Sequence, residues 1–117
     1  MAAAPISEGD ILPGALNTET TAGQATAAGA YRAQFDLSLL QSGDAVRIRA
    51  KIQIRRTATG TVFNAVQPFY DQTFTNAQAV PVVTIPTEAL TGQQIIFTIT
   101  QTTGTLRKVG FMLLQIA

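Results

Sequence analysis

The sequence of 117 residues contains no cysteine, no histidine and no tryptophan. Without cysteine the chain has no disulfide, no thiolate metal site and no thiol nucleophile. Without histidine it lacks the commonest metal ligand and the commonest general base. Tryptophan is the largest aromatic stacking surface, so its absence weakens any expectation of an aromatic platform for sugars.

Charge is also scarce. Charged residues make up 13% of the chain, against roughly 25% in typical soluble domains, and threonine, glutamine and alanine take their place. The net charge of +1 argues against binding to a polyanion such as nucleic acid. The N-terminus has no basic region followed by an apolar run, so we expect no secretion signal. No apolar stretch approaches the roughly 20 residues of a membrane helix, so we expect no membrane association.

The seven carboxylates are scattered, and most lie in expected turns or near the N-terminus. A pair could still meet in space, as glycoside hydrolysis requires, but aspartates in loops are more often turn formers. The sequence has no glycine-rich phosphate loop, nucleophile elbow or metal-ligand spacing. We therefore expect no enzymatic activity, no cofactor and no small-molecule ligand.

The clearest element is a strand over residues 45–56. Successive side chains on a strand point to opposite faces, and here one face is apolar while the other carries long polar side chains. The apolar positions are Val46, Ile48, Ala50, Ile52 and Ile54, and the polar ones are Arg47, Arg49, Lys51, Gln53 and Arg55. A chain of this length buries roughly two-thirds of its unfolded surface, which is enough for one domain.

Residues 31–39 form a second amphipathic strand, and a Ser-Gly-Asp turn separates it from the segment 45–56. The two strands form either a tight hairpin or an arch between opposite sheets. In the hairpin, matching apolar faces places Asp36 opposite Arg49 or Lys51.

Further strands are expected where apolar and β-branched residues alternate between turn signals. Proline cannot donate to a strand ladder, so Pro68 and Pro86 are expected to end two of them. The final strand is apolar on both faces, which places it in the middle of a sandwich or beneath another subunit. We predict an all-β antiparallel sandwich, with strands over 61–67, 80–85, 95–100 and 109–116, a loop over 69–79 and a helical turn over 87–92.

Residues 1–29 are rich in small and polar residues and have few apolar anchors. Such a segment cannot bury enough surface to order itself. It is therefore expected to be either a loose tail or an extended N-terminal arm that orders on a neighbouring subunit. The sandwich domain would then span residues 30–117, and the arm would contribute the contact residues Ile11, Leu12 and Leu16.

The cationic face of the strand 45–56 is the second candidate contact surface. Its neighbouring side chains lie about 6.6 Å apart, where two unit charges repel by roughly 0.6 kcal/mol in water and about 2.5 kcal/mol at an effective dielectric near 20. The face is either solvated and partly compensated by Asp36 and Asp44, or it binds an acidic protein surface. Nucleic acid is a third and weaker partner. The residues concerned are Arg47, Arg49, Lys51, Arg55 and Arg56.

Four stretches ahead of the apolar final strand resemble the small capsid cement (decoration) proteins of tailed bacteriophages. The resemblance is one of pattern and composition and covers residues 30–117. The stretches are Phe35-Asp-Leu-Ser-Leu-Leu40, Gly43-Asp-Ala-Val-Arg-Ile-Arg49, Arg55-Arg-Thr-Ala-Thr-Gly60 and Leu90-Thr-Gly-Gln-Gln-Ile-Ile-Phe-Thr-Ile-Thr-Gln-Thr-Thr-Gly-Thr105.

The resemblance implies a jelly-roll sandwich that assembles as a homotrimer and staples major capsid proteins together on the exterior of the virion. Such proteins assemble in the host cytoplasm and have no catalytic residues. The alternative is a carbohydrate- or receptor-binding module of a phage tail or fibre, with Phe69, Tyr70 and Phe74 as its aromatic platform. The other reading of these three rings is that they are plugs in a small core.

Overall fold

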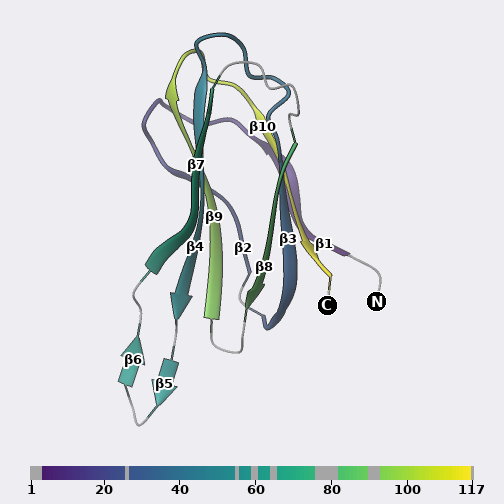
Figure 1. The fold of residues 1–117 in the computed structure, drawn as a ribbon, viewed down its shortest axis with the longest axis vertical. Helices are drawn as coiled ribbons and strands as arrows, with labels where there is room; N and C mark the ends of the chain where they lie inside the picture. The colour runs from purple at the N-terminus through teal and green to yellow at the C-terminus, as the bar shows by residue number, and fades with distance from the viewer. Residues whose placement is uncertain are drawn as a thin grey trace.

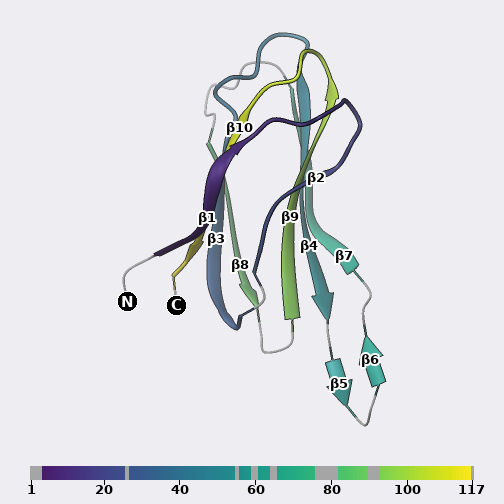
Figure 2. The ribbon, with the colours of Figure 1, turned by 180° about the vertical axis from the view of Figure 1, so that it is seen from behind.

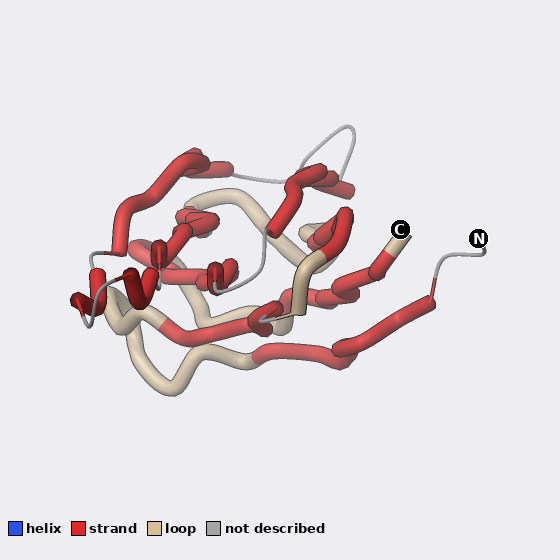
Figure 3. The backbone as a smooth tube through the Cα atoms, turned by 90° about the horizontal axis from the view of Figure 1, so that it is seen from below, coloured by secondary structure: helices blue, strands red, loops and turns tan. Residues whose placement is uncertain are grey.

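The structure is a computed structural model that describes residues 4–25, 27–54, 56–58, 61–63, 66–75, 82–89 and 93–116. Within these ranges the chain forms ten β-strands and no helix (Figures 1 and 3). The strands are β1 (Ala4–Ile11), β2 (Thr20–Ala25), β3 (Gly29–Asp36), β4 (Ala45–Ile54), β5 (Arg56–Ala58), β6 (Thr61–Phe63), β7 (Val66–Thr75), β8 (Val82–Ala89), β9 (Gln93–Thr103) and β10 (Val109–Gln115). The predicted all-β class is confirmed.

The strands pair as if the chain were one long hairpin doubled back on itself. Strand β1 pairs with β10, β2 with β9, β3 with β8, β4 with β7 and β5 with β6, and every pair is antiparallel. Successive pairs lie in opposite sheets: β1–β10 and β3–β8 are in the first sheet, and β2–β9 and β4–β7 are in the second. The first sheet has the order β1-β10-β3-β8, and the second has the order β2-β9-β4-β7. This rolled-up arrangement of eight strands in two sheets is a jelly roll, as Figures 1 and 2 show from opposite sides.

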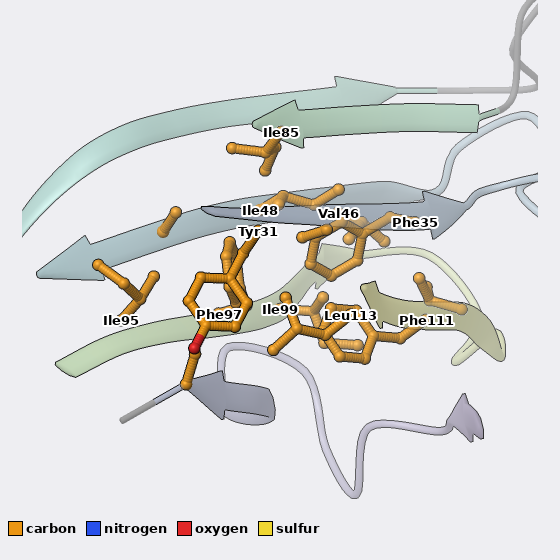
Figure 4. Close-up of a cluster of buried hydrophobic side chains, with 14 of the residues drawn as sticks. Tyr31, Phe35, Val46, Ile48, Ile85, Ile95, Phe97, Ile99, Phe111 and Leu113 are labelled. Atoms are coloured by element: carbon orange, nitrogen blue, oxygen red, sulfur yellow. The ribbon is translucent and has the colours of Figure 1, made fainter. Parts of the chain in front are cut away.

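The core lies between the two sheets and is built from the inward positions of the alternating strands. In β4 the side chains of Val46, Ile48 and Ala50 are fully buried and Ile52 packs partly buried against the core. The predicted apolar face is confirmed at these four positions, and the side chain of Ile54 is not described. Phe111 of β10 joins the sheets, because its ring lies 4.9 Å from that of Phe35 and 6.1 Å from that of Phe97. Figure 4 shows these rings gathered with the aliphatic side chains of both sheets.

The prediction of a separate N-terminal arm is wrong. Strand β1 pairs with β10 of the same chain and β2 pairs with β9, so residues 4–25 form an edge of each sheet. Backbone hydrogen bonds to two long central strands order this segment although its side chains bury little. Ile11 lies opposite Val109 and packs against the core, so it is not an outward anchor, and the predicted domain boundary after residue 29 is not observed.

The two prolines expected to end strands lie inside strands. Strand β7 runs through Pro68, and β8 runs through Pro86. Both are outermost strands of their sheets, where a missing N–H donor costs no ladder bond. The loop predicted over 69–79 is therefore strand as far as Thr75, and the helical turn predicted from Thr87 is strand as far as Ala89.

The connection between β3 and β4 is an arch, because these strands lie in opposite sheets. The tight-hairpin alternative is wrong, and Asp36 lies opposite Gly110 and Val82 instead of a cation of β4. Of the two positions predicted for the final strand, the central one is observed, since β10 lies between β1 and β3. Its outward side chains Met112 and Leu114 are half-buried.

One end of the sandwich is held by two buried polar side chains. Gln101 is fully buried; its amide group donates to the carbonyls of Thr103 and Thr105, and its oxygen accepts from the backbone N–H of Arg107. Asp44 is 2% exposed and accepts from the backbone N–H of Thr105 at 3.0 Å and from Arg107 Nε at 2.8 Å. These bonds tie the connection that follows β9 to the arch.

Because Gly104 has no side chain, its backbone can lie close to Asp44. Its φ is +90°, and a Cβ at this position would lie 2.1 Å from Asp44 Oδ1. The backbone N–H of Gln41 also donates to Asp44, at 2.8 Å. This bond, followed by the contacts with Arg107 and Thr105, lowers the pKa of the Asp44 carboxyl below its ordinary value of 3.8 despite its burial.

We predict that Gly23→Ala destabilises the fold by about 1–3 kcal/mol, the usual cost of overpacking a core. A Cβ at Gly23 of β2 would lie 2.6 Å from the ring of Phe111 and 3.3 Å from Ser7 Oγ. Urea denaturation measures the change. The matched control is Gly14→Ala, where a Cβ meets no atom within 4 Å; equal stability of the two variants would contradict the prediction.

Candidate functional site

The cationic face is the outward side of the second sheet around Arg47, Arg49 and Lys51. Because β4 alternates, these three side chains project together from the surface opposite the core. The outward threonines of the neighbouring strand β9, Thr98 and Thr100, are buried as well. This surface is therefore closely packed rather than open.

Glu19 is shared by two of the three cations. Its Oε1 accepts from Lys51 Nζ at 2.7 Å, and its Oε2 lies 2.9 Å from Arg49 Nη2 and accepts from Thr98 Oγ1 at 2.8 Å. Burial raises the pKa of Glu19, but the hydrogen bonds from Lys51 and Thr98 and the charge of Arg49 outweigh it and lower the pKa below 4.5. Glu19 is thus the anion that allows Arg49 and Lys51 to lie side by side.

Arg47 is paired with Asp71 of the edge strand β7. Arg47 Nε donates to Asp71 Oδ1 at 2.7 Å, and Nη2 donates to the second carboxylate oxygen, so the contact is bidentate. The hydrogen bond lowers the pKa of Asp71 and raises that of Arg47. With side-chain exposures of 40% and 36%, this pair is the most open part of the cationic face.

The predicted compensation by Asp36 and Asp44 is wrong. Asp36 belongs to the first sheet, and Asp44 is buried at the end of the sandwich, where it binds Arg107. The carboxylates that neutralise the cationic face are those of Glu19 and Asp71. Three cations against two carboxylates leave one net positive charge among these described side chains. Periodicity along β4 could not reveal either partner, because they come from segments 32 and 24 residues away in sequence.

The two remaining predicted cations, Arg55 and Arg56, follow the end of β4 in sequence. Arg56 opens β5, of which only the backbone is described, and Arg55 lies outside the described residues. The β5–β6 pair continues the line of β4 and β7 beyond the sandwich (Figures 1 and 2). The structure thus assigns Arg56 to this projection rather than to the row of Arg47, Arg49 and Lys51.

Two of the three predicted apolar anchors are exposed. Leu12 is 55% exposed and Leu16 is 40% exposed, and both lie in the connection that crosses from β1 in one sheet to β2 in the other. This connection is held against β9 by a 2.8 Å hydrogen bond from the backbone N–H of Asn17 to the carbonyl of Gln101. The two leucines therefore stand on an anchored segment.

The three aromatic side chains proposed as a sugar platform do not lie on one surface. Tyr70 and Phe74 are partly buried and pack against the core, and burial raises the pKa of Tyr70. Only Phe69 is well exposed, at 45%. The reading of Tyr70 and Phe74 as core plugs fits this packing.

Sequence reasoning missed an acidic groove on the outward side of the first sheet. It runs along β10, has a volume of about 510 Å³ and is lined on the β1 side by Glu8 and Asp10 and on the β3 side by Gln34 and Asp36. Its floor is Gly110 and Met112. The pairing of β1 and β3 with β10 brings these carboxylates together, and no pattern within one segment indicates it.

Comparison of the chain with protein-family models, with curated proteins and with solved structures finds no match. Within the described ranges, no group of three acidic side chains is arranged to hold a metal ion. The same part of the chain has no helix that could cross a membrane.

We predict that Glu19→Gln destabilises the protein by about 1 kcal/mol at neutral pH, the upper end for partly exposed ion pairs. The loss arises because Arg49 and Lys51 then face each other without an anion. Urea denaturation at several pH values measures it.

The effect of Glu19→Gln should depend on pH. Since folding lowers the pKa of Glu19, its ionised form stabilises the fold above the ordinary value of 4.5, and this stabilisation is lost as the pH falls through the folded value. The difference between wild type and Glu19→Gln should therefore shrink in acid. Glu88→Gln, an exposed site on β8, is the control. A difference that persists at low pH would assign the effect of Glu19 to shape rather than charge.

Proposed function

We propose that this chain is a non-catalytic structural protein that binds the exterior of a phage capsid and stabilises the shell. Its partner would be the major capsid protein, and the chain would act as a homotrimer. The observation that carries the proposal is the pair of exposed leucines, Leu12 and Leu16, held on an anchored crossover of a β-sandwich. Jelly rolls include viral capsid domains, and the sequence stretches that resemble cement proteins point the same way.

In the proposed mechanism each copy adds contact area with the shell, and the assembly of several copies repeats that contact. A subunit that rests on two neighbouring shell proteins opposes their separation, and linking several weak contacts in one assembly raises the effective concentration of each. Single exposed leucines are common on protein surfaces, so the contribution of Leu12 and Leu16 depends on their repetition in every copy. The rigid sandwich holds these contacts at fixed spacing.

The cationic face has a smaller part in this proposal than the sequence suggested. Exposed ion pairs contribute little to stability and are screened by salt, and Arg49 and Lys51 are already held by Glu19. Arg47 is the cation best placed to meet an acidic shell surface, because its side chain is 40% exposed. It would exchange part of its contact with Asp71 for one with the partner.

The alternative function, binding of a carbohydrate or receptor by a tail or fibre module, gains no support from the aromatic side chains. A stacking platform needs rings side by side and open to solvent, whereas Tyr70 and Phe74 pack against the core. The capsid proposal is therefore preferred.

We predict that particles of the phage encoding this chain contain it in stoichiometric amount on the capsid exterior, as measured by mass spectrometry and electron microscopy. Leu12→Ser/Leu16→Ser should lower its occupancy on capsids that lack the wild-type chain by at least about tenfold, because burying two leucines contributes several kcal/mol.

The matched control is Leu39→Ser, which alters a leucine of similar exposure, 53%, in the arch. Both variants should unfold at the wild-type temperature. Absence of the chain from purified particles would overturn the capsid proposal, and unchanged occupancy of Leu12→Ser/Leu16→Ser would exclude the crossover as the contact.

A further inference from the structure

The outward face of the first sheet carries apolar side chains that remain partly open to solvent. Met112 and Leu114 of the central strand β10 are half-buried, and on the outermost strand β8 Val82 is 49% exposed and Pro86 is exposed. A strand that is apolar on both faces is normally covered on both. Apolar area rimmed by charged side chains is typical of a surface that contacts another protein.

The same face carries unpaired charges of opposite sign. Arg32 and Asp36 are both exposed on β3, four residues and about 13 Å apart along the strand, and Asp10 of β1 lies beside Asp36 at the acidic groove. Among the described residues none of these three side chains forms a salt bridge. Hydrogen bonds from Ser38 lower the pKa of the Asp36 carboxyl, so it is ionised at neutral pH.

The register of the sheet arranges these residues symmetrically about one level of the sheet. Met112, Gln34 and Thr84 lie opposite one another on β10, β3 and β8, and outward positions follow at every second residue. On each strand the outward positions on the two sides of this level are complementary: a missing side chain and a large apolar one, an anion and a cation, or two apolar groups. They are Gly110 and Leu114 on β10, Asp36 and Arg32 on β3, and Val82 and Pro86 on β8.

We propose that two copies of the chain pack the outward faces of their first sheets together, about a two-fold axis that lies between the sheets and crosses the strands at the level of Gln34. Rotation about this axis reverses the strand direction and lays each strand of one copy over the same strand of the second copy. Arg32 of each copy then faces Asp36 of the other, and Leu114 faces Gly110. Because the interface is isologous, each of these contacts forms twice.

Gly110 provides the hollow that this packing needs. A Cβ at Gly110 would lie 3.1 Å from Asp36 Cβ and 3.8 Å from Asp10 Oδ1, so the two aspartates stand on either side of a position without a side chain. The groove at this point has a volume of about 510 Å³. Leu114 of the second copy fills part of it with apolar atoms, and the guanidinium group of Arg32 meets both carboxylates.

The face carries more carboxylates than cations, which limits the strength of the contact. Glu8 lies opposite Met112 on the outermost strand β1, so it comes close to Glu8 of the second copy. Because β1 is at the rim, water and salt screen this repulsion. Glu88 lies four residues from Thr84 on β8, twice as far from the axis as Pro86. Removing the charge of Glu8 should therefore strengthen the association.

The area of the face suits a weak, reversible dimer. Four strands about 4.8 Å apart and eight residues of about 3.3 Å each cover roughly 500 Å². Two copies therefore bury on the order of 1,000 Å² in total, which is at the lower end of specific interfaces. An interface of this size depends on each of its charge contacts.

This contact goes beyond the proposed function and does not depend on a shell. A two-fold face joins copies two at a time, so the homotrimer of the proposed function would use a different surface. Both contacts together would give an assembly with an even number of copies. The response to substitutions on the outward face of the first sheet reports on the two-fold contact alone.

A mixing experiment tests the two-fold contact. Arg32→Glu alone and Asp36→Lys alone should each weaken self-association by at least about 100-fold, because like charges then meet twice across the axis. An equimolar mixture of the two variants should associate again. The new carboxylate of one chain then faces the new ammonium group of the other, and the remaining Arg32 and Asp36 face each other. Sedimentation equilibrium over a range of protein concentrations measures the association.

Three further variants separate the contact from the fold. Asp10→Lys changes the groove without disturbing the hydrogen bond from Ser38 to Asp36, and it should also weaken association. Glu8→Gln should strengthen it about two- to threefold, because it removes a like-charge contact. Thr73→Glu adds a charge at an exposed position of β7 in the second sheet and should leave association unchanged. Circular dichroism verifies that each variant is folded.

The outcomes distinguish this contact from the proposed function. A wild-type chain that is monomeric at millimolar concentration overturns both the homotrimer and the two-fold contact. Self-association that Arg32→Glu and Asp36→Lys leave unchanged, or a mixture of the two variants that fails to associate, overturns the two-fold contact alone. Shell binding is judged separately, by the occupancy of Leu12→Ser/Leu16→Ser on capsids.

Discussion

The architecture depends on the antiparallel pairing of the first half of the chain with the second half. Each strand before the β5–β6 pair meets its partner after that pair, from β4 with β7 to β1 with β10. Once the doubled chain rolls up, the central strands β10 and β9 also pair with β3 and β4. The apolar faces of the alternating strands then have one place to be buried, which is the space between the sheets.

The same pairing places the charges. Because β2 lies against β9, the connection before it carries Glu19 over the outward side of the second sheet, where it pairs with Arg49 and Lys51 of β4. Because β1 and β3 flank β10, Asp10 and Asp36 lie on opposite walls of one groove. The second sheet therefore has its charges largely neutralised, whereas the first sheet presents a concentration of negative charge.

This distribution separates the surfaces by their capacity to bind a partner. A face whose cations already have anions gains little from a new acidic partner, because each new contact replaces an existing one. The crossover with Leu12 and Leu16 and the acidic groove, in contrast, are open to solvent. The proposed role in shell binding rests on the exposed leucines of the crossover.

Features that repeat within one segment could be predicted from the sequence alone. The alternation of β4 predicted its inward Val46 and Ile48, and the doubly apolar β10 predicted a central strand, because the side-chain period of a strand is a local property. Prediction from the sequence failed where the structure of a residue depends on the position of its strand in the sheet. Pro68 and Pro86 break a central strand but not an outermost one, and only the sheet order decides which strand is outermost.

The pairing of residues 4–25 and of the site charges depends on contacts between distant parts of the chain. The segment lacks the apolar side chains to order itself, yet backbone hydrogen bonds to β9 and β10 include it in the fold. The partners of Arg47 and Lys51, and the opposing walls of the groove, join residues far apart in sequence. Such contacts are fixed by strand register across a sheet, and no single stretch of sequence contains that information.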